Sequence, residues 1–157
     1  MSSTDVSGET GQAESPLGVD MNLEVVTLPV ADVDRAKAFY QRLGWRLDID
    51  LIISDEIRNV QFTPPHSGCS IQFGKGRTAA EPGSAQAMIL VVEDIDAARA
   101  DLVKRGVDVG EVQEMKPPGF DAPGRSYFAR ASFVDPDGNG WELQEITTRL
   151  PGRTWED

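Results

Sequence analysis

Glu142 is the residue to which this sequence gives the best position for chemistry. It belongs to the segment Trp141-Glu142-Leu143-Gln144, in which apolar and polar residues alternate. Alternation of this period is typical of a β-strand, so the Glu142 carboxylate should point to the face opposite Trp141 and Leu143. A carboxylate on the inner face of a sheet can ligate a metal, transfer a proton or anchor a ligand.

Few other residues could support catalysis. The chain has one histidine, His66, and one cysteine, Cys69, whereas zinc, iron and copper sites usually draw on several such ligands. His66 lies in a Pro/Ser/Gly turn, where we expect it to be exposed, and Cys69 begins the next predicted strand. This setting does not suggest a nucleophile–base pair.

Composition narrows the class of protein. The chain has 157 residues, of which 39% are hydrophobic, and this suits one domain of ordinary size. The net charge of −11 argues against nucleic-acid binding, because phosphate contacts need a basic surface. No apolar run approaches the roughly 20 residues of a membrane helix. With a single cysteine and no visible signal peptide, we expect a cytoplasmic protein that binds no membrane.

The sequence predicts two amphipathic helices, and each directly follows a predicted strand. Asp32 and Asp94 are the predicted N-caps, and Gly44 and Gly106 are predicted to end the helices. We expect strands at residues 22–30, 45–53, 58–63, 69–73, 86–92, 107–111, 127–134 and 141–144. Residues 135–140, Asp-Pro-Asp-Gly-Asn-Gly, are called the signature turn here because they hold almost every strong turn former in one run.

The two halves of the chain repeat one pattern. Residues 30–36 and 92–98 match as Val-x-Asp-(Val or Ile)-Asp-x-Ala, and the two helix-ending glycines keep the same spacing. The repeat predicts an α+β fold of two tandem βαβββ modules that form a curved mixed sheet, an open cup with the helices outside. The predicted organisation is a disordered acidic tail over 1–20, one domain over 21–148 with halves 21–78 and 85–148, and a C-terminal tail over 149–157 in which Trp155 is a candidate for docking.

These features together resemble the vicinal oxygen chelate superfamily, which includes glyoxalase I, extradiol dioxygenases, and the bleomycin and fosfomycin resistance proteins. The resemblance covers about residues 22–147. It rests on the paired modules and on three motifs: Leu28-x-Val30-x-Asp32 before the first helix, Phe39-Tyr40-x-x-Leu43-Gly44 at its end, and Asp135-Pro-Asp-Gly-Asn139 before Glu142. Many chemistries share this fold, so the resemblance predicts architecture better than function.

The resemblance also implies where a metal would bind. Metal-dependent members place ligands at four inner-face positions, which map onto Val25, Gln72, Ala87 and Glu142. Val25 and Ala87 have no donor atom, Gln72 offers only a neutral oxygen, and Glu142 alone is a good ligand. We therefore expect a glyoxalase/bleomycin-resistance-like domain with a degenerate metal site, which uses neither a metal nor another cofactor.

The inner face is predicted to be a largely apolar cup with a few polar groups, as in many small-molecule pockets. Its predicted ligand contacts are Val25, Thr27, Gln72, Ala87, Ile89, Glu142 and Gln144. The Pro/Gly-rich loop over residues 115–125 precedes a strand that would rim the cup, so it is either a lid or an ordinary exposed loop. Phe120, Arg125 and Tyr127 are the predicted contacts from this region.

Three functions remain open from the sequence. The first is a metal-independent protein that binds a small organic molecule and sequesters or carries a metabolite or drug. The second is a metal-independent lyase, isomerase or cyclase with Glu142 as general acid or base, and the third is a glyoxalase-like or dioxygenase-like metalloenzyme. Alternatively, Glu142 only pairs with a cation, Arg58 or Arg125. A homodimer is expected, because each half leaves sheet edges exposed.

Overall fold

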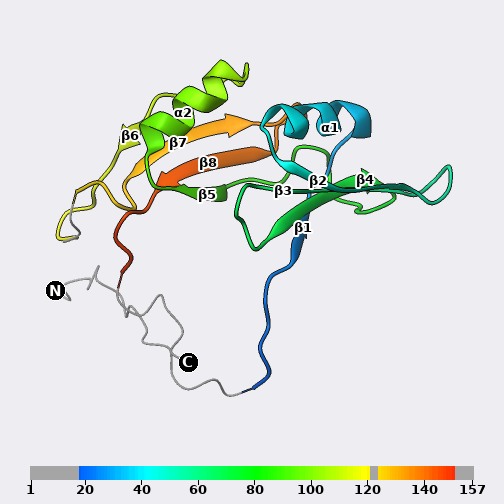
Figure 1. The fold of residues 1–157 in the computed structure, drawn as a ribbon, viewed down its shortest axis with the longest axis horizontal. Helices are drawn as coiled ribbons and strands as arrows, with labels where there is room; N and C mark the ends of the chain where they lie inside the picture. Colours follow the sequence, from blue (N-terminus) through cyan, green and yellow to red (C-terminus); the bar gives the residue numbers. More distant parts are fainter. Residues whose placement is uncertain (1–17, 121–123, 151–157) are drawn as a thin grey trace.

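The chain folds into two βαβββ modules, as the repeat predicts (Figure 1). The structure is a computed structural model that describes residues 18–120 and 124–150. The first module consists of β1 (Val25–Thr27), α1 (Val33–Arg42), β2 (Arg46–Ile52), β3 (Arg58–Thr63) and β4 (Ser70–Lys75). The second consists of β5 (Met88–Val92), α2 (Ile95–Lys104), β6 (Gln113–Glu114), β7 (Ala129–Val134) and β8 (Gly140–Glu145).

One predicted strand is wrong. Residues 107–111 form no strand, and the element at this place is the two-residue β6. Val107 and Val109 alternate with polar residues because both are buried in the core, and this burial imitates a strand pattern. The predicted first strand is also longer than the observed β1. Much of the predicted N- and C-terminal tails, including Trp155, lies outside the described residues.

The helix boundaries follow from capping. Asp32 accepts a hydrogen bond from the Arg35 N–H at 3.0 Å, and Asp94 accepts one from the Ala97 N–H at 3.1 Å. After the helices, Gly44 and Gly106 adopt φ angles of 81° and 86°. This left-handed region is readily open to glycine alone, so both helices end where the sequence predicts. No helix in the described ranges is long and apolar enough to cross a membrane.

Each module builds its own four-stranded mixed sheet. The strand order is β1-β4-β3-β2 in the first sheet and β5-β8-β7-β6 in the second. The pairs β1–β4 and β5–β8 are parallel, and the other pairs are antiparallel. Helix α1 contacts β3 and β4, whereas α2 contacts β7 and β8. In Figure 1 both helices lie on the same side of the two sheets, so one face of each sheet, here called the inner face, carries no helix.

The two modules share one hydrophobic core on the helix side. Phe39 of α1 lies 6.4 Å from Phe133 of β7 between ring centroids. Trp141 of β8 lies 6.2 Å from Tyr40 and 5.1 Å from Trp45. Both tryptophans are buried and belong to this core.

The signature turn ties the modules together through a buried polar network. The Asp135 carboxylate accepts hydrogen bonds from the Tyr40 hydroxyl at 2.9 Å and from the Asn139 amide at 2.8 Å. The same amide donates to the Pro29 carbonyl oxygen at 2.8 Å, and the Trp141 indole N–H donates to the Tyr40 oxygen at 3.0 Å. Burial, together with the Asp135 carboxylate, raises the pKa of Tyr40 well above its usual range. The turn therefore has a structural role, as the sequence suggests.

Candidate ligand-binding site

The strand registers show which of the predicted inner-face residues lie together. In the first sheet, Val25 pairs with Ser70 and Thr27 with Gln72. In the second sheet, Ile89 pairs with Glu142 and Val91 with Gln144. Paired residues on neighbouring strands point to the same face, so the predicted contacts form two groups on two different sheets.

A hollow of about 390 Å³ lies on the inner face of the second sheet. It lies over β6, β7 and β8, and Glu142 belongs to its lining. The complete lining is Gly110, Glu111, Gln113, Met115, Phe128, Arg130, Ala131, Ser132 and Glu142. Met115 and Phe128 give the hollow an apolar part, whereas the side chains on β7 and β8 give it polar groups.

Glu142 forms an ion pair at the hollow. Its Oε1 atom lies 3.2 Å from Nη1 of Arg130, which is the residue on β7 diagonal to it. The Arg130 side chain is 45% exposed, so most of its donors remain open to water or to a ligand. The cations named from the sequence are not the partners: Arg58 pairs with Asp50 and Asp34, and Arg125 pairs elsewhere.

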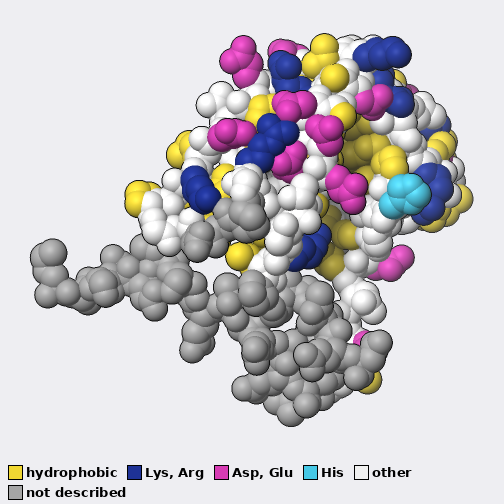
Figure 2. All heavy atoms as spheres, turned by 60° about the vertical axis from the view of Figure 1, so that its left-hand side comes forward, with side chains coloured by type: hydrophobic (Ala, Val, Ile, Leu, Met, Phe, Trp, Pro, Cys, Tyr) yellow, Lys and Arg dark blue, Asp and Glu magenta, His cyan; other side chains and the backbone are white. Residues whose placement is uncertain are grey.

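The surface around the second module mixes both signs of charge. Figure 2 shows this side of the molecule, where acidic and basic side chains alternate and hydrophobic side chains gather between them. The strong negative net charge therefore does not produce a uniformly acidic surface here. A ligand that approaches this side meets donors and acceptors close to apolar surface.

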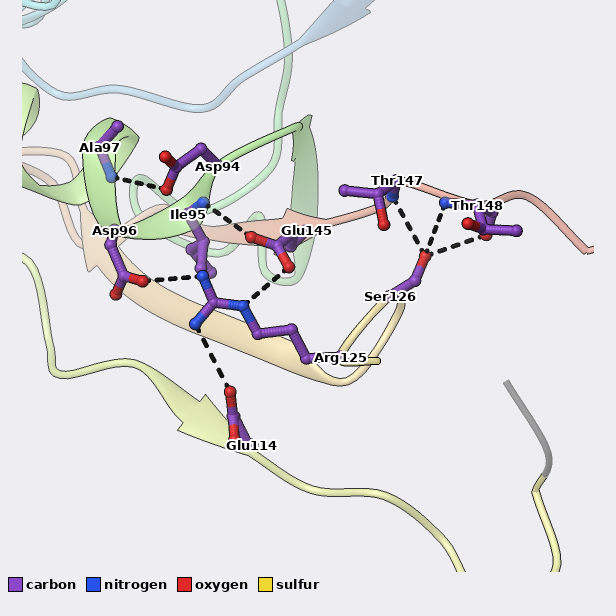
Figure 3. A network of polar contacts seen from close by, with 10 residues as sticks. All are labelled: Asp94, Ile95, Asp96, Ala97, Glu114, Arg125, Ser126, Glu145, Thr147 and Thr148. Carbon is purple, nitrogen blue, oxygen red and sulfur yellow. Dashed lines mark hydrogen bonds and ion pairs between the residues drawn. The ribbon is translucent and has the colours of Figure 1, made fainter. Parts of the chain in front are cut away.

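Arg125 is held by three carboxylates, each from a different element (Figure 3). Its guanidinium lies 2.8 Å from Glu145 on β8, 2.7 Å from Asp96 on α2 and 3.5 Å from Glu114 on β6. Glu145 is buried, and its second oxygen accepts a hydrogen bond from the Ile95 N–H at the start of α2. Hydrogen bonds to Asp96 and Glu145 raise the pKa of Arg125. This clamp favours a positioning role for Arg125, and ligand contact by this residue stays a prediction.

The residues after Arg125 fasten the end of the loop to the body of the module. The buried Ser126 hydroxyl accepts hydrogen bonds from the N–H groups of Thr147 and Thr148, and it donates to the Thr148 carbonyl oxygen. The next residue, Tyr127, accepts a hydrogen bond on its backbone oxygen from the Gln144 amide at 2.9 Å. Gln144 is thus buried and engaged with the backbone.

The loop also reaches the hollow through an aromatic contact. The Phe120 ring packs edge-on against Phe128, with 4.9 Å between centroids, and Lys116 lies 5.8 Å from the Phe128 ring centre. Phe128 and Met115 line the hollow directly. The predicted proximity of this loop to a pocket is thus present in the described residues, whereas lid motion stays a prediction.

Two non-glycine residues near the inner face have strained backbones. Ala87 has a φ of 60° and Tyr127 a φ of 72°, both in the left-handed region. Such conformations cost about 1 kcal/mol or more and often mark functional sites. Both residues are among the contacts predicted from the sequence.

The residues at the four family metal positions do not fit a metal. Glu142 pairs with Arg130, and the Gln72 amide donates to the Thr27 hydroxyl at 2.7 Å, while Val25 and Ala87 have no ligating atoms. Among the described residues, no group of three or more His, Cys, Asp or Glu side chains could hold a metal ion. We therefore derive no chemical step through a metal.

Sequence reasoning missed most of the lining contributed by β7. Arg130 and Ser132 alternate with the buried Ala129 and Ala131, so one period of two runs through β7, and Phe128 directly precedes this strand in the same period. Extending the inner-face assignment from Glu142 to this neighbouring strand would have identified all three. Gly110, Glu111 and Gln113 carried no such signal, because their segment is mostly irregular.

Comparison with known proteins agrees with this architecture. The chain is similar to the crystal structure of TnmS3, an antibiotic binding protein from Streptomyces sp. CB03234, with 27% identity and a TM-score of 0.67 over 83% of this chain and 99% of that chain. It is also similar to a glyoxalase/bleomycin resistance protein from the same organism, with 29% identity and a TM-score of 0.61 over 78% and 99% of the two chains. A superfamily member from Sphaerobacter thermophilus DSM 20745 has 27% identity and a TM-score of 0.63 over 80% and 98%. A comparison with curated proteins finds no match.

The family follows from the extent of the sequence match. The family model described as the Glyoxalase/Bleomycin resistance protein/Dioxygenase superfamily matches residues 22–143, which include both modules up to the middle of β8. The chain belongs to this superfamily.

Proposed function

We propose that this protein binds a small organic molecule without a metal, in the hollow over β6, β7 and β8, and thereby sequesters or carries it. The observation that supports this proposal best is the composition of the lining. Met115 and Phe128 offer apolar surface, and Arg130, Ser132 and Glu142 offer a few polar groups beside it. Pockets of this kind bury a ring or chain and orient it by hydrogen bonds.

The ligand class is proposed from similarity. TnmS3 is named an antibiotic binding protein, and its similarity to this chain extends over both modules. An antibiotic or a related metabolite is therefore the first class of ligand to test. The predicted cytoplasmic location would suit such a protein.

A metal-independent lyase, isomerase or cyclase is the second candidate. Glu142 lies in the hollow, where its carboxylate could exchange a proton with a bound substrate. Arg130 would then hold this carboxylate in place. Incubation with each bound ligand, followed by mass spectrometry, would detect turnover, and Glu142→Gln should abolish that turnover.

A thermal-shift screen with aromatic and polyketide-like metabolites tests the binding proposal. A ligand present at 100 times its Kd should stabilise the protein by about 2.7 kcal/mol, which raises the Tm of a chain of this size by about 5–10 °C. Arg130→Gln and Glu142→Gln should weaken binding of the compounds found. The matched control is Arg42→Gln, an exposed arginine on α1, which should leave their affinity unchanged.

Two results would contradict the proposal. If both hollow variants bind every compound as tightly as the control does, the ligand contacts lie elsewhere. If purified protein carries one equivalent of zinc, iron, manganese or nickel by elemental analysis, the metal-independent assignment fails.

The homodimer also stays a proposal, and exposed apolar residues on both inner faces support it. Ile49 and Leu51 on β2 are 42% and 52% exposed, and Ile89 and Val91 on β5 are 47% and 46% exposed. Both strands lie at sheet edges, where a second chain could pair. Light scattering coupled to size-exclusion chromatography should give twice the mass of one chain.

A further inference from the structure

The segment before β6 forms one wall of the hollow, and most of it is not a strand. Gly106 follows Gly44 by 62 positions in the repeat, so β2 of the first module corresponds to residues 108–114 of the second. Of these residues only the last two form β6, and residues 107–112 belong to no helix or strand. The residues that this segment and β6 give to the lining are Gly110, Glu111 and Gln113. This wall is therefore built largely without the hydrogen-bond ladder of a sheet.

Arg99 of α2 holds the backbone of this wall. Its Nε atom donates to the Gly110 carbonyl oxygen at 2.7 Å, and its Nη2 atom donates to the Val109 carbonyl oxygen at 3.1 Å. The Gly110 N–H group donates to the Ser132 carbonyl oxygen on β7 at 2.9 Å. Both polar backbone groups of Gly110 are thus engaged, one by the helix and one by the sheet.

The corresponding helix position of the first module is used differently. Lys37, which precedes Arg99 by the same 62 positions, pairs with the Asp50 side chain on β2 at 2.8 Å. In the described part of the chain Arg99 forms no ion pair, and its planar guanidinium spans two successive carbonyl oxygens instead. Lys37 therefore binds the side chain of a regular strand, whereas Arg99 binds backbone where the corresponding strand is missing.

We propose that Arg99 is a positioning residue of the hollow, which holds the wall at Gly110 and Glu111 in the shape that receives a ligand. The inference rests on the proposed function, because it assigns a role at the same site. Arg99 is not part of the lining, and it acts through the backbone that carries these two lining residues. A wall that is ordered before binding spares the ligand the entropic cost of ordering it. Loss of the two hydrogen bonds should therefore weaken binding.

The test uses the fluorescent dye 8-anilinonaphthalene-1-sulfonate, whose rings suit the apolar part of the hollow and whose sulfonate suits Arg130. Fluorescence titration of the full chain gives the Kd of each variant well below its Tm. Arg99→Met should weaken dye binding by about tenfold, the cost of ordering one or two groups of the wall on binding. Arg99→Lys keeps a donor for one carbonyl oxygen and should show a smaller loss. The matched control is Lys37→Met, which should keep the Kd of the parent protein.

Hydrogen exchange separates a positioning role from a purely structural one. In Arg99→Met, the amide groups of residues 107–114 should exchange faster than in the parent protein, and saturating dye should restore much of their protection. Exchange in β7 and β8 should stay close to that of the parent. A general loss of stability would instead accelerate exchange in all strands of the second module.

The outcomes distinguish failure of this inference from failure of the proposed function. If Arg130→Gln weakens dye binding while Arg99→Met does not, the hollow binds the dye and Arg99 has only a structural role. If neither variant changes the Kd, or if the parent protein does not bind the dye, both the inference and the hollow as a binding site fail. Should Arg99→Met not fold, Arg99→Lys takes its place in the comparison, and a Kd equal to that of the parent overturns the inference.

Discussion

The substitution Tyr40→Phe removes one buried oxygen atom and should weaken the buried polar network between the two modules. The substitution keeps the ring and therefore its packing against Phe39, Trp45, Phe62 and Phe73. What it removes is the hydroxyl that donates to Asp135 and accepts from the Trp141 indole N–H, and these residues belong to the second module.

The cost follows from the groups left behind. A hydrogen bond to a carboxylate contributes about 1.5–3 kcal/mol, and a buried N–H without an acceptor costs about 1–3 kcal/mol. The two contributions overlap in one network, so we expect a loss of about 3 kcal/mol in the free energy of unfolding. For a chain of this length the loss corresponds to a decrease in Tm of about 6–12 °C.

The assay is thermal and urea-induced unfolding, and Tyr127→Phe is the control. Tyr127 is the second of two tyrosines, and its hydroxyl accepts one hydrogen bond from the Leu150 N–H near the edge of the described residues. Its loss should cost about 1 kcal/mol or less, since the group is only partly buried.

The pH dependence gives an independent check of the same network. Because the pKa of Tyr40 is raised in the folded state, its contribution to stability is intact below about pH 10, the ordinary pKa of tyrosine, and is lost as the pH rises above that value. The parent protein should therefore lose more stability between neutral pH and pH 11 than Tyr40→Phe does. If Tyr40→Phe costs no more than Tyr127→Phe and has the same alkaline profile as the parent, then the buried network does not hold the modules together.

Three further changes test other parts of the fold. Gly83→Ala should lower the free energy of unfolding in urea by several kcal/mol. The φ angle of Gly83 is 81°, and a Cβ atom at this position would lie 2.1 Å from a backbone oxygen of the signature turn. A loss of about 1 kcal/mol or less would contradict this close approach. Arg125→Met should lower Tm and increase amide hydrogen exchange after residue 124, because the buried Glu145 loses its cation. Unchanged hydrogen exchange would show that the ion pairs of Arg125 do not fasten the loop. Hydrogen bonds from Arg58, and after it from Lys37, hold the pKa of Asp50 below its usual range. The protein stability that these bonds contribute should be present above about pH 4 and decline below it. In urea titrations, Asp50→Asn should lack this acid-dependent loss of stability.

The architecture could be predicted from the sequence because the sequence signals for its helices and turns are local, and several of them occur twice. Capping aspartates, helix-ending glycines and the signature turn each act over a few residues, and the repeat supplies a second copy of the capping aspartates and of the glycines. The parallel pairings of β1 with β4 and β5 with β8 were beyond such signals, because they join residues far apart in the chain.

The candidate site could be predicted only in part, because its contacts also join residues that are far apart in the chain. Strand alternation placed Glu142 on the inner face, and the register agrees. It could not reveal the ion pair with Arg130, because that contact depends on which strands are neighbours and on their register. The clamp on Arg125 likewise joins carboxylates from α2, β6 and β8, and no short stretch of sequence contains them together.

The buried polar network at the signature turn should couple the folding of the two modules. Pro29 and Tyr40 of the first module form hydrogen bonds with Asn139, Asp135 and Trp141 of the second, and these bonds would be lost if the modules separated. Neither half can satisfy its own buried polar groups, so the two modules should unfold in one cooperative transition despite their separate sheets. A chain cut within the exposed connection at residues 77–82 should yield two halves that are unstable alone and that reassemble when mixed.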